Sequence, residues 1–96
     1  MKATKVRPAG VISNNAYNEE FEDAIVVPLT TNLDMRKHAV YLNQPMLEKG
    51  RLIKESRIKV DRILSVKQEL IRKVIGKVKK EVLEEIIMGL QNILKS

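Results

Sequence analysis

One apolar run constrains the fold of this 96-residue chain more than any other feature. Residues Asp23 to Thr30 are nearly all apolar and are dense in Ile and Val. Because the run is too short for a helix between its polar flanks, it predicts a buried strand. Pro28 lies inside the run and has no backbone N–H to donate, so we expect this strand at a sheet edge or at a bulge.

A second, shorter apolar segment, Val6 to Ser13, predicts another strand with Pro8 near its start, where an edge position tolerates a missing donor. Each run has a polar side chain at one of its ends. Arg7 lies at the start of the first, and Thr30 and Thr31 close the second. Two neighbouring strands of this kind would hold a guanidinium and a hydroxyl together, and a phosphate would fit between them.

The rest of the chain predicts short elements that end in one helix. Alternation and turn-forming residues indicate a loop over 14–20 that Phe21 anchors by folding back, a strand over 38–42, turns over 44–50, a bulged strand over 57–63, and a short strand or turn over 74–78. From Val82 to Leu94 apolar residues recur at helical spacing, which predicts a terminal helix. No Ser, Thr, Asp or Asn caps its start. The fold class is therefore mainly β, a small and strongly bent sheet or barrel packed against a C-terminal helix.

Length and composition indicate one domain, residues 1–96, with a single modest core. The chain has no Cys, so it has no disulfide or thiolate metal site, and nothing in it demands an oxidising compartment. No apolar stretch reaches the length of a membrane span, and the first residues lack a signal core. We expect a cytoplasmic protein with no membrane partner.

The net charge of +6 is unevenly spread. Residues 49–80 hold twelve basic and three acidic side chains, and such a concentration attracts polyanions in a salt-dependent way. Alternation places Arg57, Lys59 and Asp61 on one face of a strand, with Ile58 and Val60 on the other. The plainer interpretation is a solvated Lys/Glu-rich surface of a heat-stable protein.

Several kinds of catalysis find little support in the residue types. A single His38, no Cys and three scattered Asp residues offer no metal-ligand spacing, so we expect neither a metal nor another cofactor. No nucleophile motif and no Gly-rich phosphate loop is present. Arg7 stands out because a fixed guanidinium at the mouth of a buried run can grip a phosphate, although an Arg before Pro is more often an ordinary surface residue.

The order of several motifs resembles the PemK/MazF family of toxin endoribonucleases. They are Val6-Arg-Pro-Ala-Gly-Val-Ile-Ser-Asn14, Ala24-Ile-Val-Val-Pro-Leu-Thr30, His38 in a short strand, and Lys54-Glu-Ser-Arg-Ile-Lys-Val-Asp-Arg-Ile-Leu-Ser-Val66. The likeness covers nearly the whole chain, from Val6 to Leu94. It implies an SH3-like small barrel of the plasmid-maintenance-toxin type, usually a two-fold homodimer, that cleaves single-stranded RNA without a metal and is held inactive by an antitoxin protein.

The resemblance also implies site residues. The family's catalytic Arg and Thr match Arg7 and Thr30. The RNA's own 2′-hydroxyl would attack the adjacent phosphate, while Arg7 aids proton transfer and holds the phosphorane and Thr30 binds a phosphate oxygen. His38 matches a structural position. RNA contacts are expected from the neighbouring loops and the basic strand face, at Asn14, Thr31, Asn32, Arg36, Lys37, Arg57 and Lys59.

Two departures from the family pattern keep alternatives open. The family normally has a strand and a loop ahead of the Arg-Pro, whereas only Met1 to Val6 precede Arg7 here, so we expect a barrel that is open at the N-terminus, with an exposed sheet edge. The acidic helix-capping residue is replaced by Lys79. One alternative is a catalytically degenerate member that binds nucleic acid or a protein partner without cleavage, and another is a gyrase-directed poison of the same architecture.

Overall fold

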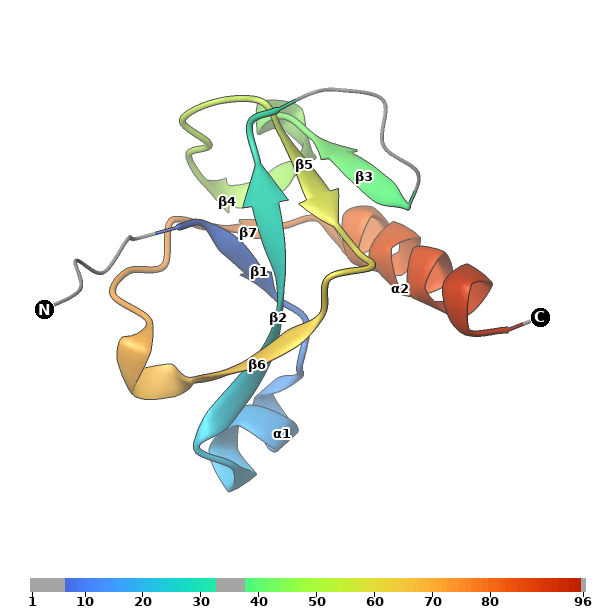
Figure 1. Cartoon of the computed structure of the whole chain (residues 1–96). Coiled ribbons are helices and arrows are strands. Elements are labelled where there is room, and N and C mark those ends of the chain that lie inside the picture. Colours follow the sequence, from blue (N-terminus) through green and yellow to red (C-terminus); the bar gives the residue numbers. More distant parts are fainter. Residues whose placement is uncertain (1–6, 33–37, 96) are drawn as a thin grey trace, which may run out of the picture.

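The structure, a computed structural model, describes residues 7–32 and 38–95. Its organising element is β2 (Asp23–Thr30), which pairs antiparallel with three other strands. β1 (Ala9–Val11) lies along one edge of β2, and β6 (Leu64–Lys67) followed by β5 (Ser56–Lys59) lies along the other. β3 (Ala39–Leu42) extends the sheet beyond β5. Figure 1 shows β2 running through the middle of the molecule among these strands.

β2 is a central strand, and the edge or bulge expected from Pro28 is wrong. Pairing with β6 ends at Val26, and pairing with β5 begins at Leu29. On the β1 side, the Leu29 N–H donates to the Pro8 carbonyl at 3.1 Å, so the ladder bonds fall on the neighbours of Pro28. The nitrogen of Pro28 thus faces the short gap between the β6 and β5 pairings, where its lack of an N–H removes no ladder bond.

A second, two-stranded sheet joins β4 (Leu47–Gly50) to β7 (Gly76–Val78). Gly50 has φ 87° and lies opposite Gly76, and a Cβ on Gly50 would collide with the Ile75 carbonyl oxygen, so the close approach requires glycine. Within the described residues no ladder joins this sheet to the larger one, so the barrel is open, as expected.

The core lies between the larger sheet and α2 (Lys80–Leu94), which confirms a mainly β fold with a C-terminal helix. Val82 and Ile86 are the buried residues of α2. Gly89 of α2 faces Val60, and a Cβ there would lie in van der Waals contact with Val60 Cγ2, at 3.4 Å. The buried cluster comprises Val27, Val40, Leu42, Ile58, Val60, Val82 and Ile86.

The helix ends at Leu94 as predicted and begins at Lys80, two residues before the predicted start. The missing cap is confirmed, since Lys79 makes no side-chain capping hydrogen bond. The far half of its apolar stripe is exposed, including Ile87 and Leu94. None of the described helices is long and apolar enough to cross a membrane.

The loop expected over 14–20 is wrong, because α1 (Asn15–Glu20) occupies it. Asn14 caps this helix: its Oδ1 accepts the Tyr17 N–H at 2.9 Å. The Tyr17 and Phe21 rings lie one turn apart with their centroids 4.6 Å apart. Asn is favoured both in turns and at helix N-caps, and here the capping role decided the outcome.

The single bulged strand expected over 57–63 is also wrong. β5 ends at Lys59, a turn closed by the Arg62 N–H and the Lys59 carbonyl at 3.0 Å follows, and β6 begins at Leu64. The slip in alternation at Arg62 therefore marked a turn.

Two other predicted segments differ as well. The turns over 44–50 contain a 3-10 turn (Gln44–Met46) and all of β4. The first strand is shorter than expected, beginning at Ala9 just after Pro8 and ending at Val11. Val6, where it was expected to start, lies outside the described residues.

Ile58→Ala tests where the core lies. Ile58 is 2% exposed and contacts the sheet and α2 cluster, so its truncation should lower the free energy of unfolding by about 2–5 kcal/mol. Ile53→Ala is the matched control, because Ile53 is 92% exposed. Urea denaturation followed by circular dichroism measures both, and equal losses in the two variants would contradict this core.

Candidate active site

Three strands place one side chain each in a row on the outward face of the larger sheet. Thr30 of β2 pairs with Arg57 of β5, and Arg57 pairs with Tyr41 of β3. Directly opposite residues on antiparallel strands point to the same face. The opposite face carries the buried Ile58 and Val40, so the row faces outward. Adjacent strands lie about 4.8 Å apart, which puts the Thr30 and Tyr41 backbones roughly 10 Å apart.

Arg7 lies two residues ahead of β1, whose start runs along the Thr30 end of β2. The register pairs Ala9 with Pro28, and the Leu29 N–H still bonds to the Pro8 carbonyl one residue further on. The pairing of β1 with β2 ends at Ala9 and Pro28, and Arg7 would lie opposite Thr30 only if the same register continued by two more residues. Arg7 is exposed. We call Arg7, Thr30, Arg57 and Tyr41 the cross-strand row.

In the turn after β2, the Thr30 hydroxyl acts as a hydrogen-bond acceptor. Thr30 Oγ1 accepts the Asn32 backbone N–H at 3.2 Å. Because the oxygen serves as an acceptor here, its own hydrogen remains available to a further acceptor. A phosphate oxygen beside Thr30 would be such an acceptor.

A polar cluster surrounds Tyr41 at the other end of the row. The Tyr41 hydroxyl is hydrogen-bonded to Glu55, and this bond, together with burial and the negative charge of Glu55, raises the pKa of Tyr41. A hydrogen bond from Asn43 and the positive charge of Arg57 oppose the rise in this pKa without cancelling it. Tyr41 therefore remains a neutral phenol beside a carboxylate and a guanidinium.

Two buried polar atoms in this cluster have no hydrogen-bond partner among the described residues: Asn43 Oδ1 and Arg57 Nε. Arg57 is half-buried, so its guanidinium is only partly solvated. Lys59 lies two residues along β5 on the same face, opposite Ala39. The outward face of β5 is thus cationic, while Ile58 and Val60 behind it are buried as the alternation predicts.

The other predicted RNA contacts are scattered. Thr31 and Asn32 are exposed and directly follow Thr30. Asn14 caps α1, which adjoins the Asp23 end of β2, so the structure does not bring it to the row. Arg36 and Lys37 lie outside the described residues.

His38 comes just before β3, in the left-handed backbone region at φ 61°, and its carbonyl accepts the Val60 N–H at 3.2 Å. These contacts agree with a structural position. Within residues 7–32 and 38–95, no three His, Cys, Asp or Glu side chains gather as a metal-ligand set.

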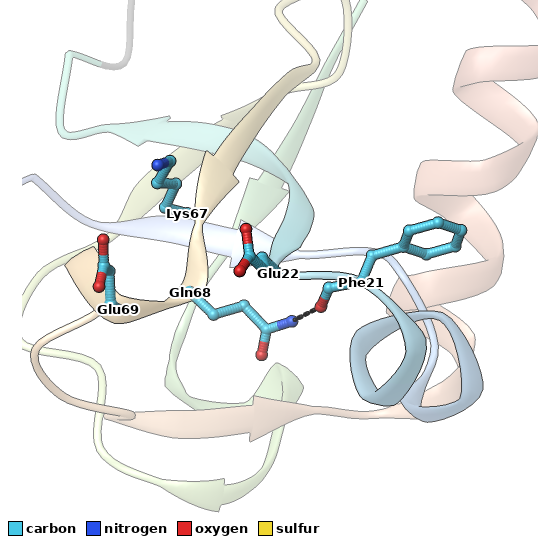
Figure 2. A pocket seen from close by; sticks show the side chains of 5 residues that line it. All are labelled: Phe21, Glu22, Lys67, Gln68 and Glu69. Carbon is cyan, nitrogen blue, oxygen red and sulfur yellow. Dashed lines mark hydrogen bonds between the residues drawn. The ribbon is translucent and has the colours of Figure 1, made fainter.

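A hollow of about 310 Å³ lies at the opposite end of β2 and does not include the row. Phe21, Glu22, Lys67, Gln68 and Glu69 line it, and Figure 2 shows the Gln68 amide directed at the Phe21 carbonyl. That amide also donates to the Asn18 and Asp23 carbonyls, at 2.8 and 3.3 Å. The Gln68 side chain is therefore committed to joining α1 to the sheet.

Nothing in the sequence singles out Tyr41, Asn43 or Glu55 as functional residues. Alternation over 38–42 already points Tyr41 and Ala39 to one face. What alternation cannot supply is the pairing of β3 with β5 and of β5 with β2, which carries Tyr41 to the same row as Thr30.

Comparison with known proteins gives one family. A family model described as PemK-like, MazF-like toxin of type II toxin-antitoxin system matches residues 2–94. No curated protein sequence matches the chain.

Solved structures with the same fold include three informative neighbours. Mycobacterium tuberculosis toxin MazF-mt6 is 16% identical, with a TM-score of 0.77 over 92% of this chain and 85% of that one. An endoribonuclease in complex with its cognate antitoxin, from a mycobacterial species, is 23% identical, with a TM-score of 0.76 over 92% and 80%. A MazE-MazF structure from Deinococcus radiodurans is 23% identical, with a TM-score of 0.77 over 94% and 83%. At this identity the neighbours establish the fold, which is the MazF-like fold expected from the sequence.

Titration of Tyr41 tests the polar cluster. The chain has two tyrosines, so Tyr17→Phe leaves Tyr41 as the only phenol, and its tyrosinate absorbance should rise with a midpoint above the ordinary value of about 10. Since the pKa is raised by folding, the cluster's contribution to stability is complete below the unfolded pKa and is lost as pH rises through the folded one. Adding Glu55→Gln should lower the midpoint. An unchanged midpoint, with the fold verified by circular dichroism at each pH, would contradict the Tyr41–Glu55 contact.

Proposed function

Because the chain belongs to the family of PemK-like, MazF-like toxins of type II toxin–antitoxin systems, we propose that it is an endoribonuclease that cuts single-stranded RNA without a metal ion. The RNA itself supplies the nucleophile, since its 2′-hydroxyl attacks the adjacent phosphorus. The products are a 2′,3′-cyclic phosphate and a 5′-hydroxyl. The protein's task is to position the phosphate and stabilise the charge that develops on it.

The observation that carries this proposal is the register of β1, β2 and β5. Thr30 and Arg57 are paired residues on one face, and the Pro8 carbonyl that follows Arg7 accepts the N–H of Leu29, the residue before Thr30; both support a site shared by Arg7, Thr30 and Arg57. Two cations flanking a hydroxyl donor suit a phosphate, because Arg presents paired donors to phosphate oxygens.

Each group has a distinct role. The Arg7 guanidinium bonds to the phosphate oxygens and stabilises the phosphorane, in which charge builds up on these oxygens. The Thr30 hydroxyl donates to one of them, its oxygen being held by the Asn32 N–H. Arg57 and Lys59 attract the backbone of the strand on either side without reading its bases.

We propose in addition that the chain acts as a cytoplasmic homodimer inhibited by an antitoxin protein. Two of the neighbouring structures support this by their composition, as one is an endoribonuclease with its cognate antitoxin and another is a MazE-MazF complex. An antitoxin segment that folds on binding gives up ordering entropy, which keeps the complex specific yet removable.

The second candidate function is binding of nucleic acid without cleavage. The favouring observation is the charge of residues 49–80, with twelve basic and three acidic side chains, which would hold a polyanion by itself. The two candidates differ in whether the backbone of the RNA is broken.

The first test is incubation of the purified protein with a long single-stranded RNA in EDTA. We expect fragments that end in a 2′,3′-cyclic phosphate. Arg7→Ala should cut about 100-fold more slowly or worse, and Arg7→Lys should recover only part of the loss, because a lysine keeps the charge and loses the paired donors. Arg72→Ala is the control, as it removes an exposed arginine in the segment between β6 and β7. Intact RNA, or cutting that survives Arg7→Ala, would refute the proposal.

The second test measures affinity separately, with an RNA whose 2′-hydroxyls are methylated so that no cleavage follows. The logarithm of the binding constant should fall linearly with the logarithm of salt concentration. Arg57→Ala and Lys59→Ala should each weaken binding and reduce the slope by about 1. A slope that neither substitution changes would remove the β5 face from the interface.

A further inference from the structure

Single-stranded RNA presents unpaired bases as well as phosphates, and the polar groups of Arg7, Thr30 and Arg57 suit the phosphates alone. Proteins that bind single strands commonly hold the bases on aromatic side chains, which offer a flat apolar face to any base. The chain has three aromatic side chains, two Tyr and one Phe. A surface that stacks a base therefore has few residues from which it can be built.

Two of the three rings are engaged with each other. Tyr17 lies in α1 and Phe21 caps its C-terminal end, with the ring centroids 4.6 Å apart and the ring planes tilted by 38°. This pair adjoins the Asp23 end of β2, whereas Thr30 is at the other end of the strand. Tyr41 is thus the aromatic residue that lies in the cross-strand row.

The position of Tyr41 in β3 directs its side chain outward. The neighbours Val40 and Leu42 are buried in the core, whereas Tyr41 is half-buried on the opposite face. Two residues back on that same face is Ala39, whose methyl group is too small to cover an aromatic ring. β3 is the last strand of the larger sheet, and no other described strand pairs with its outer edge. The ring therefore has a small neighbour on one side and the sheet edge on another.

The strand beside β3 supplies charges that hold the RNA backbone. Arg57 pairs directly with Tyr41, and Lys59 pairs with Ala39. Both basic side chains are half-buried on the outward face, and their charges attract phosphates without reading bases. On its other side Arg57 pairs with Thr30. A strand of RNA that crosses β2, β5 and β3 thus meets Thr30, Arg57 and Tyr41 in turn.

We propose that the Tyr41 ring stacks against one base of the RNA, in a nucleotide that flanks the cut phosphate. This assignment rests on the nuclease function proposed above. The Thr30 and Tyr41 backbones are roughly 10 Å apart, two strand spacings, and one nucleotide spans this gap from its phosphate to its base. Stacking needs only the flat face of a base, so it tolerates any base, and it requires that base to be unpaired. Tyr41 therefore selects single-stranded RNA by direct contact with the substrate.

The charge state of Tyr41 agrees with this role. The Glu55 side chain raises the pKa of Tyr41 above its ordinary value, and the positive charge of Arg57 opposes the rise. Tyr41 is therefore uncharged at neutral pH. An uncharged ring brings no repulsion against the phosphates that Arg57 and Lys59 attract.

Affinity for a short RNA with methylated 2′-hydroxyls tests the stacking, because such an RNA is bound but not cut. Tyr41→Leu removes the ring and keeps an apolar side chain, and it should weaken binding about 10-fold or more. Tyr41→Phe keeps the ring and should bind as tightly as the unsubstituted protein. Tyr17→Leu is the matched control, an identical substitution in α1, and should leave the affinity unchanged. Circular dichroism and thermal unfolding verify the fold of each variant.

Abasic RNA identifies the base that stacks. When each base of the RNA is removed in turn, removal at one position should weaken binding by the unsubstituted protein about 10-fold. The same removal should cost the Tyr41→Leu variant nothing further, because the two changes delete the two halves of one contact. Cleavage of the unmethylated RNA should occur directly beside that position. Tyr41→Leu should leave the affinity for an RNA duplex unchanged, whereas Arg57→Ala should lower it.

Tyrosine fluorescence reports on the same contact while the ring is kept. The chain has no Trp and two Tyr, so in the Tyr17→Phe variant all tyrosine emission comes from Tyr41. A base stacked on the ring should quench this emission, and an RNA that lacks the identified base should not.

Three results would overturn the stacking of Tyr41. They are equal weakening by Tyr41→Phe and Tyr41→Leu, additive losses when Tyr41→Leu is combined with abasic RNA, and an equal loss of affinity for the duplex. A coupled base away from the cleavage site would overturn its placement beside the cut phosphate. RNA that shows the coupling but stays uncut would refute the nuclease function and uphold the stacking, whereas RNA that is not bound would overturn both.

Discussion

The backbone ladder of β2 is the constraint on which the rest of the structure depends. Along one edge it bonds to β1, and along the other it changes partner from β6 to β5 across Val27 and Pro28. A strand shared in this way bends the sheet and brings the N-terminal β1 to the same place as β5 and β6 from the second half of the chain. Proline is an unusual residue for a central strand, and it is tolerated here because the change of partner leaves its position without a ladder bond to make.

Alternate residues of the paired strands β2 and β5 face the core and the candidate site. Leu29 and Ile58 pair on the inner side, and Thr30 and Arg57 pair next to them on the outer side. The outward groups therefore inherit the rigidity of the packed layer beneath them, which is what a site needs to hold a phosphate in one geometry. Beside them, Glu55 raises the pKa of Tyr41 and the positive charge of Arg57 lowers it.

The sequence predicted those elements whose signal is local. Asp23 to Thr30 was recognisable from an unbroken apolar run, and the terminal helix from its spacing. The loop over 14–20 was predicted wrongly because an Asn such as Asn14 is common both in turns and at helix caps. The bulged strand over 57–63 was predicted wrongly because a turn interrupts the alternation of side chains in the same way as a bulge. Arg7 and Thr30 were expected to lie close because each is at the end of an apolar run, and the family likeness supplied their roles. The position of Tyr41 beside Arg57 depends on which strands pair, and no local pattern encodes that.

One consequence follows from the placement of Thr30 beside Leu29. Side chains alternate along a strand, so a shift of β2 by a single residue against β5 would turn Leu29 outward and carry the hydroxyl into the interior. The same shift would turn the buried Val27 away from the interior. The alignment of β2 with β5 therefore sets the interior and the outward hydroxyl at once, so that neither can be moved without the other.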